Sequence, residues 1–207
     1  MKRNLSTHQK TVKLVMLGLL MSIMLILSYT PLGYLKTAGV EITFNMIPVA
    51  IAAIVLGPVG GAIIGGVFGI TSFLQCIGVG GLSPFGAALF AINPVYTFIF
   101  CFFTRVLVGV IVGSVCRLTE KHIKRLTSVR CAIAGFLAAF INTALFMVTL
   151  VFLFGGDPFI KDMIGGRNFI VFACMFVGFN AVLEMIASTV ITTAVGVPLL
   201  KSKVLSK

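Results

Sequence analysis

Long apolar runs, separated by short polar segments, constrain this chain more than any other feature. Hydrophobic residues make up 59% of the sequence and charged residues only 10%, against roughly 45–50% and 25% in an average soluble domain. A soluble protein of 207 residues cannot hide that much apolar surface from water. Most of the chain must therefore lie in lipid, and its length fits a single membrane domain, residues 1–207.

A helix needs about 20 apolar residues to cross a bilayer. The apolar runs predict an all-α bundle of six membrane helices at about 12–30, 44–56, 62–76, 94–115, 131–154 and 168–195. Gly57 and Pro58 mark the turn between the second and third of these. Pro94 separates a short helix or re-entrant segment near 85–92 from the fourth, and Pro198 is expected to end the sixth.

The placement of the basic residues predicts the topology. Lys and Arg gather in the N-terminal segment, in the segment 117–130 and in the C-terminal tail. Basic segments stay on the cytoplasmic side, and six crossings place all three there, with both termini cytoplasmic. Five or seven crossings are the alternative and put one basic cluster outside. The net charge of +11 is thus interpreted as a topology signal and not as a nucleic-acid site, because the phenylalanines lie in the apolar runs, away from the lysines.

Ionisable side chains inside a membrane are costly and are usually functional. Arg105 and Glu184 lie near the middle of their predicted helices, and Arg105 is roughly 16 Å from the outer end of its helix at 1.5 Å per residue. Asn142 and Asn180 fall at about the same depth, and Asn180 shares a helix face with Glu184. Two interpretations stay open. Arg105 and Glu184 neutralise each other, or Arg105 binds the carboxylate of a ligand while the asparagines bind its hydroxyl or amide groups.

Four further polar residues lie nearer the predicted outer surface and either complete such a site or cap helix ends: Gln75, Asn93, Tyr96 and Asn45. The sequence has no G-x-x-x-x-G-K-[ST] phosphate loop, no H-E-x-x-H pair and no carboxylate pair suited to acid–base chemistry. It therefore predicts a binding protein without a cofactor or metal, and not an enzyme.

Small residues at four-residue spacing predict close helix packing in a membrane. Gly61, Gly65 and Gly69 suggest packing inside the bundle, as do Ala134 and Ala138. A similar pair, Gly18 and Ser22, lies on the first helix. That pair either packs internally or docks a helix of another subunit, and the sequence does not choose between these.

The stretch 40–62, with its Leu-Gly-Pro-x-x-Gly turn at 56–61, resembles the substrate-binding (S) components of energy-coupling factor (ECF) vitamin transporters. The resemblance covers most of the chain. Ser83-Pro-Phe-Gly86, Ile92-Asn-Pro94 and Thr104-Arg105 look most like the pantothenate-binding branch. Because that branch would place ligand contacts at Arg105 and Asn142, both are expected to touch the vitamin.

The resemblance implies a multi-pass protein of a prokaryotic plasma membrane that captures a vitamin outside and reorients to release it inside. A separate transmembrane coupling subunit would contact Gly18 and Ser22, two cytoplasmic ATPases would use the ATP, and the loops 33–41 and 78–86 would act as lids. Folate, riboflavin and hydroxymethylpyrimidine are the alternative substrates. The third helix lacks the aspartate of some other branches, which weakens the first two. Outside the family, a small membrane enzyme or an assembly subunit is the alternative.

Overall fold

The computed structural model describes residues 7–30, 33–36, 41–122 and 126–202, of which it gives the backbone alone at 34–36, 41–42, 121–122, 169–170, 173, 175–177 and 179. The elements follow in the order α1 (Thr7–Tyr29), β1 (Tyr34–Lys36), β2 (Glu41–Thr43), α2 (Met46–Cys76), α3 (Pro84–Ile92), α4 (Pro94–His122), α5 (Thr127–Phe154), α6 (Pro158–Ile164) and α7 (Phe169–Lys201).

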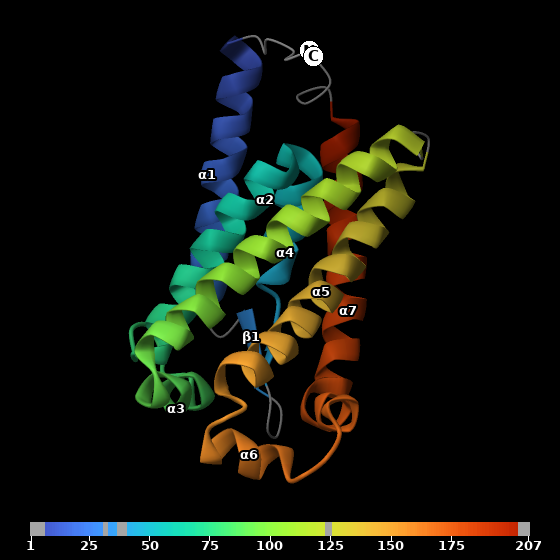
Figure 1. Ribbon diagram of the computed structural model, residues 1–207. Coiled ribbons are helices and arrows are strands. Elements are labelled where there is room, and N and C mark those ends of the chain that lie inside the picture. Colours follow the sequence, from blue (N-terminus) through green and yellow to red (C-terminus); the bar gives the residue numbers. More distant parts are fainter. Residues whose placement is uncertain (1–6, 31–32, 37–40, 123–125, 203–207) are drawn as a thin grey trace.

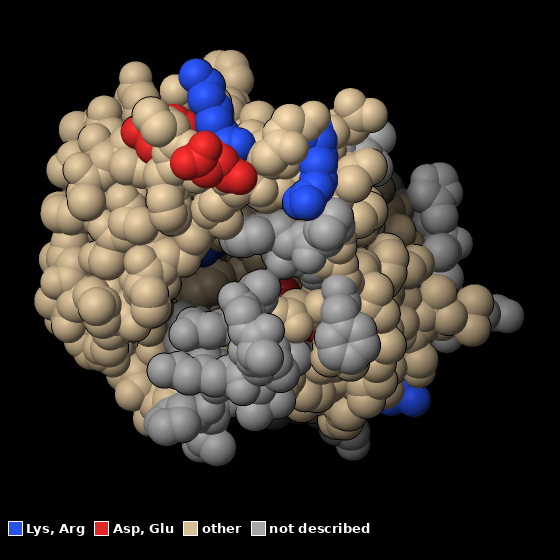
Figure 2. Space-filling view, turned by 90° about the horizontal axis from the view of Figure 1, so that it is seen from below, with Lys and Arg blue, Asp and Glu red and all other residues tan. Residues whose placement is uncertain are grey.

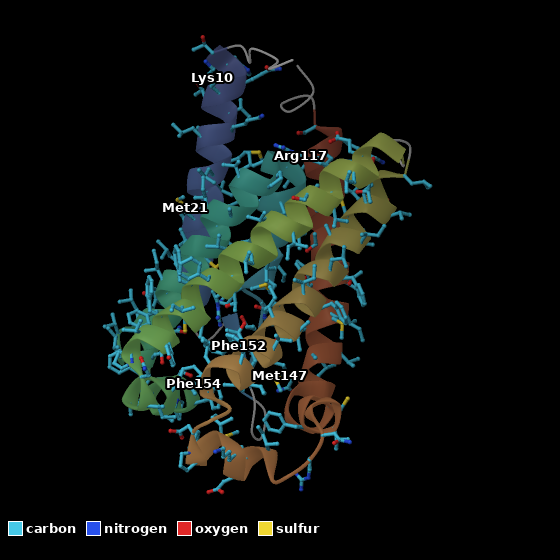
Figure 3. The ribbon with its side chains drawn as sticks, viewed as in Figure 1. Lys10, Met21, Arg117, Met147, Phe152 and Phe154 are labelled. Atoms are coloured by element: carbon cyan, nitrogen blue, oxygen red, sulfur yellow. The ribbon has the colours of Figure 1, made fainter. Side chains whose placement is uncertain are left out.

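The long helices form a bundle with two distinct ends (Figure 1). The beginning of α1, the end of α7 and the junction of α4 with α5 lie together at one end, here called the termini end. The short helices α3 and α6 lie at the opposite end, the α3–α6 end. Figure 3 shows the basic side chains of Lys10 and Arg117 toward the termini end, with Phe152 and Phe154 toward the other.

Among the described residues, five helices are long and apolar enough to cross a membrane: α1, α2, α4, α5 and the Asn180–Lys201 part of α7. The count is one lower than the six predicted because α2 is a single element across 44–56 and 62–76. Gly57 interrupts α2 with φ 78° and ψ −166°, and Pro58 follows it. The six-crossing count stays a prediction.

The two arms of α2 fold back on each other at this interruption, since a Cβ added to Gly61 would lie 3.2 Å from the Cβ of Ala53. The first arm, 46–56, is roughly 16 Å long at 1.5 Å per residue, which is shorter than the ~30 Å hydrocarbon core. Its residues from Met46 to Ile54 are all buried. The first arm is therefore a central helix of the bundle, enclosed by the longer ones.

The sequence prediction missed three elements, the strands β1 and β2 and the helix α6. β1 and β2 form an antiparallel hairpin with Leu35 opposite Ile42, so the fold is not purely helical. The predicted loop 155–167 contains α6, in which the Asp157 side chain accepts the Phe159 N–H at 2.9 Å and Pro158 occupies the first turn. The expectation that Pro198 ends the last helix is wrong, because α7 continues to Lys201. A proline in a final turn removes one N–H at the polar end of the helix, where the carbonyl it leaves unpaired can reach water.

Two apolar clusters fill the bundle. One lies toward the termini end and includes Met24, Val49, Ile64 and Val108. The other lies toward the α3–α6 end and includes Cys76, Leu89, Phe100, Cys101, Leu150, Phe154 and Ile160. The cysteines are free thiols, with the sulfurs of Cys76 and Cys101 3.8 Å apart. Along α4, Arg105 lies between Cys101 of the second cluster and Val108 of the first.

Candidate ligand-binding site

The glycines of α2 place Arg105 in the bundle. The contact of α2 with α4 is the most extensive between two elements of the described chain. A Cβ added to Gly65 would lie 2.3 Å from the carbonyl oxygen of Arg105, and one added to Gly61 would lie 2.5 Å from that of Gly109. Only glycine allows so close a backbone approach. This close contact of Gly61 and Gly65 with α4, here called the seam, therefore fixes the backbone of α4 at Arg105.

The Arg105 side chain is 8% exposed and enclosed by protein groups. One terminal nitrogen, Nη1, donates to the carbonyl oxygen of Phe100 and to the hydroxyl of Thr104, each at 3.2 Å. The guanidinium carbon lies 5.0 Å from the ring centre of Phe68 and 5.9 Å from that of Phe100. Its Nε is buried and has no hydrogen-bond partner in the described part of the chain. One edge of the cation is thus held by the protein, and Nε on the other side is an unused donor.

Glu184 is 9% exposed on α7. Its Oε1 accepts the backbone N–H of Thr43 in β2 at 2.7 Å. Across residues 41–122 and 126–202, no ion pair joins Glu184 to Arg105; the ion pair found there is Arg130 with Glu120 at 3.6 Å. The interpretation in which the two buried charges neutralise each other by direct contact is therefore wrong.

Two buried charges that do not pair directly are costly to keep in an apolar bundle, since each gives up its hydration. Arg105 is compensated by two neutral acceptors and two ring faces, and Glu184 by one N–H. Both groups are therefore candidates for binding a ligand.

Asn142 and Asn180 lie at the same level as Arg105. The rings of Phe100 and Phe146 are 4.9 Å apart, which aligns α4 with α5 one turn away from Arg105 and Asn142. A Cβ on Gly135 would lie 2.5 Å from the carbonyl oxygen of Ser188, and seven or eight residues further along each antiparallel helix stand Asn142 and Asn180. Both asparagines are buried, at 9% and 8% exposure.

The buried face of α7 carries a polar stripe that the sequence analysis recognised only in part. Asn180, Glu184, Ser188 and Thr192 follow one another at four-residue spacing, and all four are buried. Within the residues described, the hydroxyls of Ser188 and Thr192 have no hydrogen-bond partner. The spacing itself was the signal that could have extended the predicted polar layer to these two residues.

The surface at the α3–α6 end is hollowed, as Figure 2 shows in a view from that end. Atoms of Lys or Arg and of Asp or Glu are visible within the hollow, and the other charged groups seen from this side lie farther out on the surface. Among the described residues, the buried charged side chains are Arg105 and Glu184. The hollow opens at the end of the bundle opposite the termini.

The four outer candidates have separate surroundings. The Asn93 Oδ1 accepts the N–H groups of Val95 and Tyr96 at the start of α4, as a helix cap does. Gln75 donates through Nε2 to the carbonyl oxygen of Ser28 at 2.6 Å and so ties α2 to α1. Tyr96 is 42% exposed, with its ring 6.2 Å from that of Phe154. Asn45 is fully buried at the start of α2, and its side chain makes no cap bond.

The small-residue pair of α1 faces outward. A Cβ added to Gly18 meets nothing within 4 Å. Ser22 is exposed and turns its hydroxyl back to the Gly18 carbonyl oxygen at 3.0 Å. The buried residues of α1 are Leu20, Met24 and Ser28, on another face. This pair therefore does not contribute to packing within the described chain.

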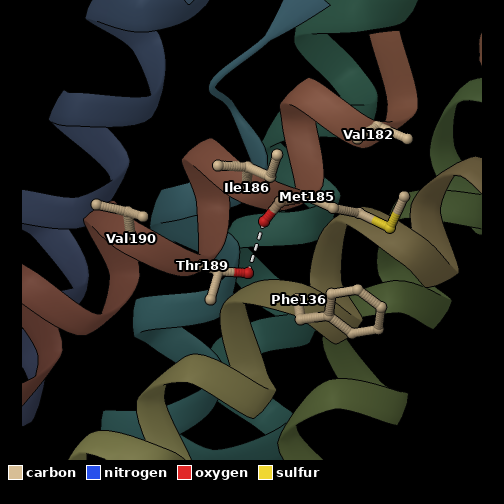
Figure 4. A pocket seen from close by; sticks show the side chains of 6 residues that line it. All are labelled: Phe136, Val182, Met185, Ile186, Thr189 and Val190. Carbon is tan, nitrogen blue, oxygen red and sulfur yellow. Dashed lines mark hydrogen bonds between the residues drawn. The ribbon is translucent and has the colours of Figure 1, made fainter. Parts of the chain in front are cut away.

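An apolar groove of about 290 Å³ lies between α5 and α7 (Figure 4). Its lining includes Phe136, Val182, Ile186 and Val190, each of which is 45% exposed or more. These α7 residues stand two positions from Asn180, Glu184 and Ser188, on the opposite side of the helix. The groove belongs to the outer, lipid-facing surface and is separate from the polar layer.

Comparison with known proteins decides the family. Residues 12–196 match the family described as "ECF transporter, substrate-specific component". The chain belongs to this family of S components. It is also 32% identical over 200 residues to a protein of Leuconostoc mesenteroides subsp. mesenteroides named "Pantothenate transporter PanT", and the match covers 92% of this chain and 93% of that protein.

The family fixes the class of activity. This S component is the substrate-binding subunit of an ECF transporter in the cell membrane, and not an enzyme. Its apolar helices agree with a multi-pass membrane protein. The family resemblance inferred from the sequence is confirmed, and the alternatives outside the family are wrong.

Four residues beside the buried charges were not predicted. Phe100, Thr104 and Phe68 contact the guanidinium of Arg105, and Thr43 contacts Glu184. Thr104 adjoins Arg105 in sequence, which is a weak signal for such a contact. Phe68 and Thr43 come from other elements, so their roles in this S component depend on the fold and no local pattern indicates them.

Proposed function

We propose that this S component binds pantothenate from the outer side of the membrane through the polar layer around Arg105. The observation that carries the proposal is a guanidinium that is 8% exposed, has no carboxylate partner among the described residues and keeps its Nε unused. The similarity to a protein named as a pantothenate transporter supports this choice of vitamin.

Pantothenate has a carboxylate at one end and an amide and two hydroxyls toward the other. A guanidinium binds a carboxylate best through two parallel N–H donors, and the buried Nε of Arg105, which has no partner among the described residues, would be one of them. Asn142 and Asn180 would hydrogen-bond the amide, and the second oxygen of Glu184 would accept a hydroxyl. Folate, riboflavin and hydroxymethylpyrimidine are the competing substrates.

Calorimetry of the purified full-length protein, with pantothenate and with each competing compound, tests the substrate. We expect binding of pantothenate without ATP. Arg105→Ala should weaken it about 100-fold, since it removes a charged, bidentate contact. Arg105→Lys keeps the charge but loses the planar fork, so about tenfold is expected. Arg167→Ala removes an exposed cation and serves as the control.

The Arg105→Ala variant also separates an effect on binding from an effect on folding. A folded Arg105→Ala protein, judged by its thermal transition and its elution as a single species, assigns the loss to the ligand. Wild-type protein that binds a competing vitamin and not pantothenate would overturn the proposed substrate while leaving the family intact. Binding that survives Arg105→Ala unchanged would overturn the proposed site.

We propose six membrane crossings, with the termini end in the cytoplasm and the α3–α6 end outside. The grouping of Lys10, Lys13, Arg117 and Lys201 toward the termini end supports this orientation. Gly156→Cys and Ser202→Cys, in a cysteine-free background, place single thiols at opposite ends of the bundle. In intact cells a membrane-impermeant maleimide should label position 156 and spare position 202; the reverse pattern would invert the topology.

Transport itself is assigned to partner subunits. The sequence lacks a phosphate loop, so ATP would be used by two cytoplasmic ATPases that act through a transmembrane coupling subunit. The exposed notch of Gly18 and Ser22 is the proposed contact with that subunit. Reorientation of the S component in the membrane would then release the vitamin inside. The loops 33–41 and 78–86 are the proposed lids, although residues 37–40 lie outside the described chain.

A further inference from the structure

We propose that Glu184 is a positioning residue that fastens the β1–β2 hairpin to α7 above the polar layer, and that this latch slows the release of bound ligand. The proposal deepens the proposed function and rests on it for the part that concerns ligand release. It changes the role of Glu184 from a ligand contact alone to the link between the site and its cover.

The hairpin offers a free donor at the required place. In an antiparallel pair, successive residues of a strand point their N–H groups alternately toward the partner strand and away from it. Phe44 donates toward the hairpin, to the carbonyl oxygen of Gly33 at 3.0 Å. The N–H of Thr43 therefore points away from β1, and it reaches Glu184 at 2.7 Å.

The acceptor is held inside the bundle. Glu184 is 9% exposed and stands one turn from Asn180 on the buried face of α7. β2 contacts α7 directly. A backbone N–H that donates to a carboxylate in such surroundings is stronger than a neutral hydrogen bond exposed to water. Because this bond joins two segments 141 residues apart, it can hold the hairpin against the site in a way that the local hairpin bonds cannot.

Thr43 is also tied to the start of the next helix. Its hydroxyl accepts the backbone N–H of Asn45 at 3.1 Å, and Asn45 is fully buried where α2 begins. The latch thus acts on a strand end whose other side is anchored in the core. Loss of the Glu184 contact should free the hairpin while α2 stays in place.

Hydrogen–deuterium exchange of the full-length protein without ligand tests the latch directly. We expect Glu184→Ala to raise exchange at Thr43 about tenfold or more, with little change in α5 or α7. Glu184→Gln keeps an acceptor oxygen but not the charge. Exchange at Thr43 in this variant should therefore lie between that of the wild-type protein and that of Glu184→Ala. This local pattern and its rescue by glutamine distinguish a latch from a residue that only stabilises the fold.

A second pair of variants removes the donor in place of the acceptor. Thr43→Pro deletes the N–H that binds Glu184, and with it the hydroxyl that accepts the Asn45 N–H, without deleting a bond of the hairpin, and proline is tolerated at strand edges. Thr43→Ser keeps both the N–H and the hydroxyl and is the matched control. If the two groups act through one bond, Thr43→Pro should add almost nothing to the effect of Glu184→Ala on the exchange of residues 33–36.

The consequence for ligand is measured as the dissociation rate of pantothenate. We expect Thr43→Pro to accelerate release about tenfold and Thr43→Ser to leave it unchanged. Unchanged exchange in Glu184→Ala, or effects that add in full in the double variant, would overturn the latch. Wild-type protein that fails to bind pantothenate while Glu184→Ala still raises exchange would overturn the proposed substrate and keep the latch.

Discussion

The seam between α2 and α4 and the notch on α1 share a sequence pattern and differ in what lies opposite. Gly61 and Gly65 of the seam face backbone atoms of α4 at distances that leave no room for a Cβ. Gly18 of the notch faces nothing within 4 Å. Small residues at four-residue spacing therefore mark a surface made for close approach, and the tertiary structure shows whether the approaching helix belongs to the same chain.

The difference between the two regions also separates their roles. The seam holds the backbone of Arg105 in position, so it supports the proposed ligand site from behind. The notch touches no site residue and remains open on a helix whose exposed side chains include Leu14, Val15 and Leu19. Substitutions in the seam should impair folding and ligand binding together, and those in the notch should impair neither.

The largest effect is expected for Gly65→Val. Its Cβ would overlap the carbonyl oxygen of Arg105, and backbone atoms cannot move aside as a side-chain tip can. We expect destabilisation of about 3 kcal/mol or more, with loss of ligand binding, measured by thermal unfolding and calorimetry. The neighbouring Gly66→Ala is the control, because its Cβ would meet side-chain atoms alone, the Phe102 ring at 3.5 Å and a Val106 methyl group at 3.6 Å, both at ordinary van der Waals distance. Equal effects of the two would break the comparison.

Gly57→Ala tests the turn that opens the seam. Its φ of 78° with ψ of −166° lies in a region that is almost restricted to glycine. The Cβ would also meet the Arg117 guanidinium at 2.9 Å, which is flexible and can move. We expect a loss of about 2 kcal/mol in the free energy of unfolding. Gly156→Ala is the control, since its Cβ meets nothing within 4 Å; a neutral Gly57→Ala would contradict the prediction.

A smaller effect is expected for Gly135→Ala, which extends the comparison to the contact of α5 with α7. The Cβ would lie 2.5 Å from the Ser188 carbonyl oxygen. The higher helix propensity of alanine offsets part of the clash, which leaves about 1 kcal/mol of destabilisation. A Cβ added to Gly178 in α7 would meet nothing within 4 Å, so Gly178→Ala should be neutral or stabilising. Stabilisation by Gly135→Ala in an unfolding titration would show that the contact of α5 with α7 is looser than its geometry implies.

The smallest effect on stability, within about 0.5 kcal/mol, is expected for Gly18→Leu. Because the notch is empty, the leucine fits the S component and its ligand affinity should not change. Its association with the coupling subunit, measured by co-purification or by binding in nanodiscs, should weaken about tenfold. Ile23→Phe enlarges a side chain on a different face of α1 and is the control. Unchanged association in Gly18→Leu would remove the notch from the proposed interface.

Local patterns predicted the positions of most elements but not all of them. Ser83 and Pro84 begin α3, and Pro94 begins α4, where such residues start helices. Asp157, Pro158 and Gly165 carried the same start and stop signals for α6 and were overlooked. The hairpin could not have been predicted from three-residue strands, because so short an alternation has no distinct periodicity.

The features of the candidate site also divide into those that the sequence predicted and those that it could not. The depth of Arg105, Asn142 and Asn180 followed from counting residues along helices, since the rise per residue is constant. The partner of Glu184 did not follow, because Thr43 lies 141 residues away and contributes a backbone N–H that any residue type except proline could supply.

The sequence by itself determined the solvent of this protein, because no packing arrangement could hide so much apolar surface from water. It also determined which groups are costly enough in lipid to require a reason for their presence. Only the tertiary structure decided that Arg105 and Glu184 stand apart, that one small-residue stripe is closed by α4 and that another is open. Each of these depends on which segment lies opposite, and such long-range pairing is not encoded in the spacing of residues along a single helix.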